Sequence, residues 1–145
     1  MRQSGHMIVL DTNVLSEALR PLPEPSVLAW LAKQPRTSLF TTTVTQGEVL
    51  YGIRLLVDGK RRRDLWDAAQ KIFAEDFAGQ VLNFDSDAAE MFADIASVRR
   101  KAGKPISQFD AMIAAMARSR GAILATRNAK DFDACGIDVV DPWAA

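Results

Sequence analysis

The segment Ser107–Ala117, SQFDAMIAAMA, decides the fold that this sequence predicts. After its first turn the segment is apolar on every side, which is the pattern of a helix enclosed between other layers of structure. Asp110 is the exception, because it places a carboxylate in the first turn of that helix. Ser107 stands three residues before Asp110, and this spacing is typical of a capping box at a helix start. The segment therefore predicts an internal helix whose first turn carries a negative charge.

Short apolar strands alternate with helices along the rest of the chain. Strands are predicted at residues 7–10, 81–84, 122–126 and 137–140, and another begins at Leu39 and runs into TTTVT. Helices are predicted at about residues 14–19, 26–33, 45–56, 60–76, 87–102 and 107–119. This alternation indicates βαβ units and a parallel sheet with helices on both faces. We expect an α/β fold, a three-layer α/β/α sandwich around a central, mainly parallel sheet.

Length and composition favour one domain. The chain has 145 residues, of which 48% are hydrophobic, enough for one core but not for two ordinary domains. Residues 1–6, MRQSGH, have no periodicity and are interpreted as a leader, so the predicted domain is 7–145. No apolar run reaches the ~18 to 20 residues that cross a bilayer, and no signal peptide is recognisable. The single cysteine, Cys135, excludes an internal disulfide, and we expect a cytoplasmic protein without membrane contact.

Two counts restrict the chemistry. The only histidine, His6, lies in the leader, which removes histidine-based acid/base catalysis and a Cys/His zinc site. The 18 basic and 18 acidic residues give zero net charge, so the domain as a whole does not attract nucleic acid. Contact with a polyanion must therefore be local or assisted by a metal.

Acidic residues are predicted to meet at one edge of the sheet. Open parallel sheets bind ligands outside the carboxyl ends of their strands. Asp11 directly follows the first strand, and Asp131 follows a later one after the polar run TRNAK. Glu48 and Asp110 lie near the starts of helices that a doubly wound chain would begin at the same edge. We expect these four side chains to converge there.

Each of these acids also has a simple structural interpretation, which for Asp131 is a solvent-facing cap of a short helical turn at about residues 130–133. Asp11 could form an Asx turn or cap the next helix. Glu48 follows Thr45 at the spacing of a capping box, as Asp110 follows Ser107. Burial favours the alternative, because the helix around Asp110 is apolar and Glu48 shares a side with Gly52 and Leu55. Carboxylates that point inwards together repel one another and need a cation, and oxygen donors without histidine or thiolate favour Mg²⁺ or Mn²⁺.

Four segments carry a resemblance to a known family. They are MIVLDTNVLSE, TVTQGEVLYGI, KPISQFDAMIAAMARSRGAILATRNAKDF and GIDVVDPW, in that order along the chain. Together they resemble PIN-domain ribonucleases, specifically the VapC-like toxins of VapBC or FitAB type toxin-antitoxin pairs. The resemblance covers Met7 to Trp143 and implies a PIN-like fold.

The resemblance also implies an activity and a set of site residues. Asp11, Glu48 and Asp110 match the three principal acidic positions of the family. The fourth acid matches Asp131 in many relatives, whereas others carry it where this chain has Asn128. These positions would hold one or two Mg²⁺ or Mn²⁺ ions and hydrolyse RNA phosphodiester bonds. The implied function is a metal-dependent endoribonuclease toxin that a cognate antitoxin neutralises.

Neutral and basic residues beside the acids have two interpretations each. Asn13 and Thr126 could bind a metal water or a phosphate, or could simply be turn residues at strand ends. Arg127 and Lys130 could position the RNA backbone. The basic runs 61–63 and 99–101 are predicted to be solvated helix faces, with contact to a long RNA as the alternative.

Partners and rival functions complete the prediction. The antitoxin is expected to wrap an apolar groove near the first two helices and to place its tail near the acids. The candidate groove residues, which could instead be ordinary core, are Val14, Leu15, Leu28, Trp30 and Leu31. A homodimer is expected, with operator DNA contacted only indirectly through the antitoxin. The alternatives are a catalytically silent PIN-like binding module and a phosphoaspartyl phosphatase or receiver domain, although Asn13 replaces the second acid of the latter class.

Overall fold

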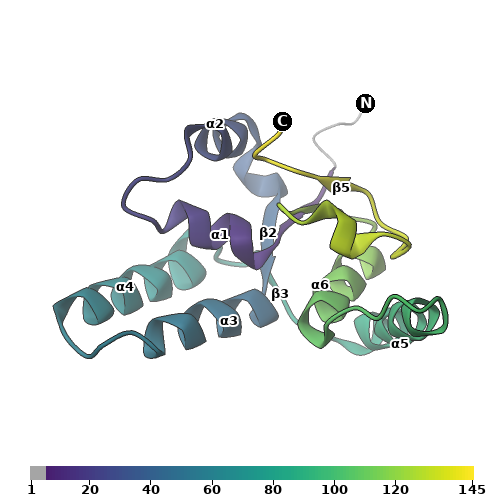
Figure 1. Cartoon of the computed structure of the whole chain (residues 1–145). Helices are drawn as coiled ribbons and strands as arrows, with labels where there is room; N and C mark the ends of the chain where they lie inside the picture. Colours follow the sequence, from purple (N-terminus) through teal and green to yellow (C-terminus); the bar gives the residue numbers. More distant parts are fainter. Residues whose placement is uncertain (1–5) are drawn as a thin grey trace.

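The computed structural model describes residues 6–145 and shows a sheet of five parallel strands (Figure 1). Strand β1 (Ile8–Leu10) lies in the centre, between β2 (Leu39–Thr42) and β4 (Ile123–Ala125). The edges are β3 (Val81–Leu82) and β5 (Val139–Val140), which gives the order β3-β2-β1-β4-β5. Every strand pair is parallel, which confirms the predicted sheet. Of the predicted leader, only the exposed His6 lies within the described residues.

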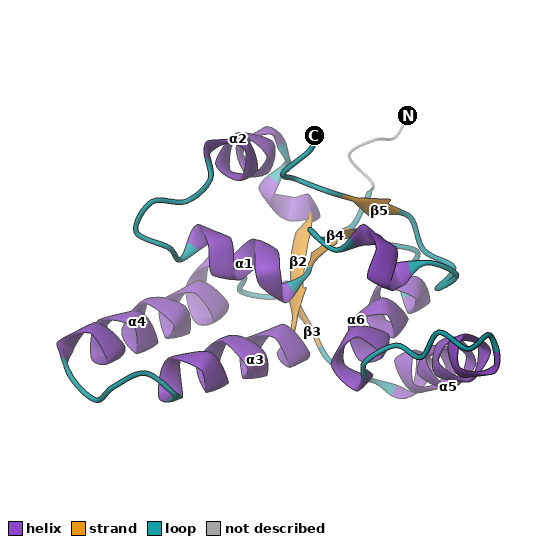
Figure 2. Ribbon diagram, in the orientation of Figure 1, coloured by secondary structure: helices purple, strands orange, loops and turns teal. Residues whose placement is uncertain are grey.

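Helices cover both faces of this sheet, as the three-layer prediction requires (Figures 1 and 2). One layer consists of α1 (Thr12–Ala18), α2 (Pro25–Lys33), α3 (Thr43–Arg54) and α4 (Lys60–Lys71). The other consists of α5 (Ser86–Lys101) and α6 (Gln108–Ser119). A π-helical turn, Ile72–Asp76, extends α4, and short 3-10 helices occupy Arg36–Ser38 and Ala129–Phe132. No helix among the described residues has the length and apolarity needed to span a membrane.

The central strand divides the core into two. Val9 faces the α5 and α6 layer, whereas Ile8 and Leu10 face the layer of α1 to α4. This alternation follows from the period of two in a strand and makes β1 apolar on both faces. Helix α6 is buried along most of its length, which confirms the internal helix that the sequence predicts.

The boundary between β2 and α3 differs from the prediction. The strand ends at Thr42, whose side chain accepts a hydrogen bond from the Thr45 backbone N–H group and caps α3. Thr43 to Thr45 therefore form the first helical turn and not part of a strand. Glu48 lies in the second turn, so the predicted capping box of Thr45 and Glu48 is wrong. Leu55 is also 68% exposed, which contradicts an inward side for it.

The carboxyl ends of β1 and β4 define the edge where the acids are expected. The chain leaves β1 towards β2 through one helix layer and enters β4 from the other layer, so the winding reverses between these strands. Hydrogen bonds continue past both strand ends, from the Asp11 N–H group to the Ala125 carbonyl and from the Thr126 N–H group to the Val140 carbonyl. In open parallel sheets, the carboxyl edge at such a reversal is the usual place for a ligand.

Candidate metal centre

Asp11 is the single residue between β1 and α1 and is only 5% exposed. One carboxylate oxygen, Oδ1, accepts a hydrogen bond from the Thr12 N–H group at 2.8 Å, which caps α1. The other oxygen, Oδ2, accepts one from the Thr126 hydroxyl at 2.7 Å. Burial raises the pKa of Asp11, and the charges of Asp110 and Glu48 raise it further, while the two hydrogen bonds oppose the rise. The capping interpretation of Asp11 is therefore correct.

Glu48 is held by the hydroxyl group of Thr12, which in turn contacts the hydroxyl group of Thr45. Thr12 Oγ1 donates to Glu48 Oε1 at 2.6 Å and lies 3.1 Å from Thr45 Oγ1. Because the single hydroxyl proton of Thr12 is directed at Glu48, Thr45 is the donor in the second contact. Thr12 and Thr45 were not predicted as site residues. A polar residue directly after the strand-end aspartate was the available signal for Thr12.

Asp110 occupies the first turn of α6, as predicted, and is half-buried. The Ser107 hydroxyl accepts a hydrogen bond from the Asp110 N–H group at 3.2 Å, which confirms Ser107 as the N-cap. Burial raises the pKa of Asp110, hydrogen bonding to Ser107 opposes the rise, and the charge of Asp131 adds to it. Asp110 is thus coupled electrostatically both to Asp11 and to Asp131.

The two candidates for the fourth position share one short loop. Asp131 lies in the 3-10 helix that follows β4 and has an exposed side chain. Asn128 precedes this helix, and its backbone carbonyl accepts from the Asp131 N–H group at 3.0 Å. The backbone N–H of Asn128 donates to the Thr126 hydroxyl at 3.2 Å, while its side chain is exposed. Of the two, Asp131 supplies the charge that reaches Asp110.

Asn13 and Thr126 connect the ends of β1 and β4. Asn13 Nδ2 lies 3.4 Å from Asp11 Oδ2 and 3.3 Å from Thr126 Oγ1. The side-chain amide oxygen of Asn13, Oδ1, accepts a hydrogen bond from the Arg127 backbone N–H group at 3.3 Å. Thr126 is fully buried. Both residues therefore orient Asp11. They are also residues at strand ends, as the alternative interpretation predicted, and their neutral side chains donate hydrogen bonds to its carboxylate.

Two exposed basic residues border the acids. The Arg127 guanidinium lies 5.0 Å from the centre of the Trp143 ring, in a cation–π contact. Lys130 lies in the same loop as Asp131 and is exposed. Both stand close in the chain to the polar edge, so a polyanion that approached the acids would meet positive charge there.

The donor set suits a hard divalent cation. Its members are carboxylates and hydroxyls, the oxygen ligands that Mg²⁺ and Mn²⁺ prefer, and a cation would offset the charges that raise the pKa values of Asp11 and Asp110. In residues 6–145, no three His, Cys, Asp or Glu side chains stand close enough to hold one ion as they are. Asp11 and Glu48 instead point at Thr126 and Thr12. Metal binding therefore requires side-chain rotation towards a common centre.

A parallel sheet with acidic side chains at its carboxyl edge defines a class of α/β proteins. In this class the acidic, oxygen-rich edge lies at the switch point, where the direction of winding reverses. Comparison with known proteins specifies the class further. The family model described as PIN domain matches residues 8–136. This chain belongs to the PIN domain family.

Individual relatives match almost the whole chain. The VapC ribonuclease Y4jK of Sinorhizobium fredii is 38% identical, over 94% of this chain and 98% of the relative. The toxin FitB of Neisseria gonorrhoeae is 37% identical, over 94% and 99% of the two chains. Among solved structures, FitAB bound to an IR36 DNA fragment superposes with a TM-score of 0.88 at 37% identity, covering 94% of this chain and 96% of that one.

Proposed function

We propose that this protein is a metal-dependent endoribonuclease toxin that hydrolyses RNA phosphodiester bonds and is neutralised by a cognate antitoxin. The observation that carries the proposal is the placement of Asp11, Glu48 and Asp110 at the switch-point edge of a PIN domain, with their charges coupled. The names of its relatives, a ribonuclease and a toxin, support the same activity. Asp131 is the proposed fourth acid.

The residues divide the work by charge. Asp11, Glu48, Asp110 and Asp131 would hold Mg²⁺ or Mn²⁺, which when bound supplies charge neutralisation at the scissile phosphate and activates a water. In the metal-free protein, Thr126 and Thr12 hold Asp11 and Glu48 through the hydrogen bonds of their hydroxyl groups. The guanidinium of Arg127, steadied by Trp143, would bind the RNA backbone together with Lys130.

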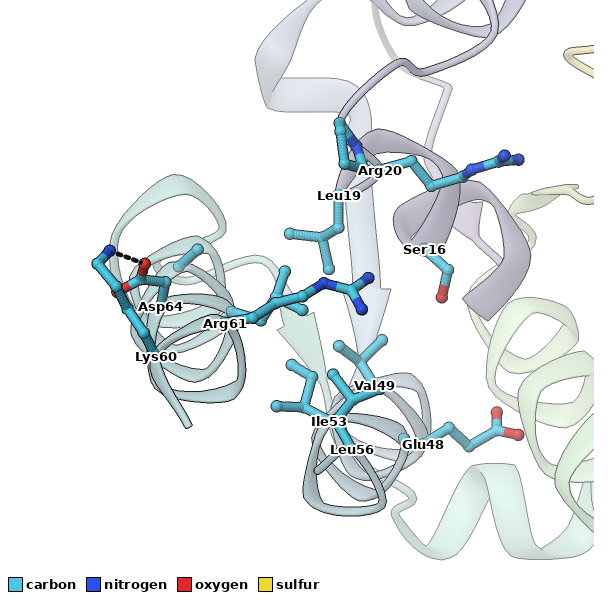
Figure 3. Close-up of a pocket in the computed structure, with 14 residues that line it drawn as sticks. Ser16, Leu19, Arg20, Glu48, Val49, Ile53, Leu56, Lys60, Arg61 and Asp64 are labelled. Carbon is cyan, nitrogen blue, oxygen red and sulfur yellow. Dashed lines mark hydrogen bonds and ion pairs between the residues drawn. The ribbon is translucent and has the colours of Figure 1, made fainter. Parts of the chain in front are cut away.

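An open groove of about 1050 Å³ between α1, α3 and α4 suits an antitoxin segment (Figure 3). Figure 3 shows Leu19, Val49 and Ile53 facing the hollow, Arg61 reaching in from α4, and the Glu48 carboxylate at one end. A bound peptide could therefore bury apolar side chains and still reach the acids. Of the residues predicted for the antitoxin groove, Val14 and Leu15 are core residues at 0% and 5% exposure, whereas Leu28 is 44% exposed.

A smaller hollow on the other side of α3 is the proposed dimer face. It has a volume of about 700 Å³, and its lining includes Tyr51 and Phe109. These large side chains are 66% and 54% exposed and line the same hollow. A second copy of the chain would cover them. Operator DNA would be contacted through the antitoxin, in keeping with the DNA-bound FitAB structure.

Two glycines of α3 separate these surfaces experimentally. Gly52 lines the groove and Gly47 lines the smaller hollow, and a Cβ atom added at either one meets no atom within 4 Å. Gly52→Gln should abolish copurification with the coexpressed antitoxin and leave the oligomeric state unchanged. Gly47→Gln should shift the mass measured by light scattering to that of a monomer. The reverse pattern would exchange the two assignments.

The catalytic proposal is tested by incubating the purified protein with total RNA, with and without Mn²⁺, and mapping the cut ends. We expect cleavage only with the metal, and none with Asp11→Asn. Intact RNA in every reaction, from a folded protein that still binds an antitoxin, would favour the silent binding module instead.

A further inference from the structure

Arg99 is a buried cation that the proposed mechanism does not use. It lies in the last turn of α5 and is only 8% exposed, whereas its neighbours Arg100 and Lys101 are exposed. The prediction of a solvated face for residues 99–101 is therefore wrong for Arg99. A buried charge is costly unless hydrogen bonds satisfy it, so its contacts indicate what it is kept for.

The Arg99 guanidinium donates to backbone groups of two separate segments. Nε donates to the Lys104 carbonyl at 2.7 Å. Nη1 donates to the carbonyls of Asp131 and Asp133 at 2.8 Å and 3.1 Å, and lies 3.7 Å from Cys135 Sγ. Within residues 6–145, no carboxylate forms an ion pair with Arg99. The guanidinium is thus satisfied by backbone carbonyl groups, for which its planar fork of donors is well suited.

Each of the two segments leads to a proposed acid. Lys104 follows the turn that ends α5, where Gly103 has φ +77° and the Lys104 N–H group returns to the Arg99 carbonyl at 3.0 Å. Three residues later, Ser107 caps α6 and starts the turn that carries Asp110. On the other side, the guanidinium holds the peptide carbonyl of Asp131 itself.

We propose that Arg99 is a positioning residue that fixes the segment before Asp110 and the segment of Asp131 relative to each other, so that the two carboxylates are kept at a separation one ion can bridge. This inference rests on the proposed metal site. The two acids belong to different elements, α6 and the 3-10 helix after β4, and Arg99 from α5 donates to the backbone on both sides. Without Arg99, metal binding would have to order the segment after β4 that carries Asp131.

Arg99→Lys tests the inference, since lysine keeps the charge but lacks the fork that reaches both segments. We expect Mn²⁺ affinity, measured by calorimetry without RNA, to fall by about 10-fold or more, in the range typical for groups that orient metal ligands. Arg100→Lys is the matched control on the exposed face and should bind Mn²⁺ like wild type. Amide hydrogen exchange should accelerate at residues 104–107 and 129–135 in Arg99→Lys only.

A double-mutant cycle with Asp131→Asn distinguishes positioning from a general effect on stability. If Arg99 acts through Asp131, Arg99→Lys should change Mn²⁺ affinity by less than about 2-fold in the Asp131→Asn background. Equal losses in both backgrounds would overturn the inference. An unchanged Mn²⁺ affinity in Arg99→Lys would overturn the inference as well, but would leave the proposed metal site intact. Absence of Mn²⁺ binding by the wild type would instead refute the proposed function.

The wild-type protein offers a test that does not depend on the folding of a variant. If the two segments are fixed to each other, Mn²⁺ should slow amide exchange in residues 104–107 and 129–135 together. Protection of one segment without the other would contradict the inference.

Discussion

Asp11 uses both of its carboxylate oxygens before any ligand arrives, one for the N-cap of α1 and one for the Thr126 hydroxyl. These bonds favour the charged form, but burial and the charges of Asp110 and Glu48 oppose it and dominate. The residue is therefore held in its place and rotamer at an electrostatic cost. Such a cost is reasonable where a cation is to be bound.

Asp11→Asn should abolish RNA cleavage and leave the fold intact. The amide carbonyl can still cap α1, the contact with Thr126 is weakened, and the desolvated charge is gone. Because the pKa of Asp11 is raised in the fold, ionising it lowers the stability of the metal-free wild type as pH rises from about 4 towards neutral. Thermal melting without metal should therefore give the variant an equal or higher Tm at pH 7, with a smaller advantage at pH 4. A markedly lower Tm at pH 7 would mean that Asp11 is chiefly structural.

Asp131→Asn and Asn128→Ala should decide the fourth position in favour of Asp131. Asn128 offers only a neutral carbonyl, whereas the charge of Asp131 already reaches Asp110. We expect Asp131→Asn to slow cleavage and weaken its dependence on Mn²⁺ while the first ion still binds, and Asn128→Ala to have a smaller effect. Cleavage rates measured against Mn²⁺ concentration provide the comparison. A normal profile for Asp131→Asn beside a collapsed one for Asn128→Ala would reverse the assignment.

The sequence identified residues whose signals are local. Ser107 and Asp110 are three residues apart, so their cap could be predicted from spacing alone. The hydroxyl groups that hold the carboxylates could not, because Thr12 and Glu48 are 36 residues apart and Asp11 and Thr126 are 115 apart. Their contacts exist only once β1 has neighbours on both sides. Arg99 was missed for the same reason, since an arginine near a helix end ordinarily faces solvent.

At the scale of elements, a helix start decides how firmly an acid is held. Asp110 lies in the first turn of α6, where the exposed Ser107 is the N-cap. The same cap arrangement explains the misplaced boundary of α3. The threonine-rich TTTVT favours a strand by propensity, but the side chain of Thr42 ends the strand by capping the helix.

Ser107→Ala should lower the free energy of unfolding by about 1 kcal/mol, the usual effect of losing an N-cap side chain. It should also raise the pKa of Asp110 further, because hydrogen bonding to Ser107 opposes the rise. Urea denaturation gives the stability, and Ser107→Thr, which keeps a capping hydroxyl, is the control. Equal stability of the alanine and wild-type proteins would show that the cap contributes little to α6.

At the scale of the whole molecule, the alternation of strands and helices was enough to predict a parallel sheet with two covered faces. The order of the strands was not predicted. Strand β1 pairs with both β2 and β4, and the pairing with β4 joins parts of the chain that are far apart in the sequence, which local patterns do not indicate. The groove between α1, α3 and α4 was not predicted either, for a related reason. It depends on how α1 and α3 pack against α4, which the apolar pattern of each helix does not specify.

Divalent metal should stabilise the whole fold through the acids at the switch point. A ligand that binds only the folded state at about 100 times its dissociation constant adds ~2.7 kcal/mol, or roughly 8 °C in Tm for a chain of this size. Protons compete with the metal, because Asp11 and Asp110 have raised pKa values and must ionise to bind it. The Tm shift with Mn²⁺ should therefore be small near pH 5 and grow towards pH 7.5.

Asp110→Asn should reduce that shift at pH 7.5 and weaken its pH dependence, while the exposed Asp87→Asn, in the first turn of α5, serves as the control. Scanning calorimetry or fluorescence melts at rising Mn²⁺ concentration and several pH values give the comparison. The result also tests how the side chains close on an ion, since no three of the described acids are close enough to do so without rotating. A wild-type Tm that does not move at millimolar Mn²⁺ would exclude the acids as a metal site. A full shift in Asp110→Asn would exclude Asp110 alone and leave Asp11, Glu48 and Asp131 as the acids that bind.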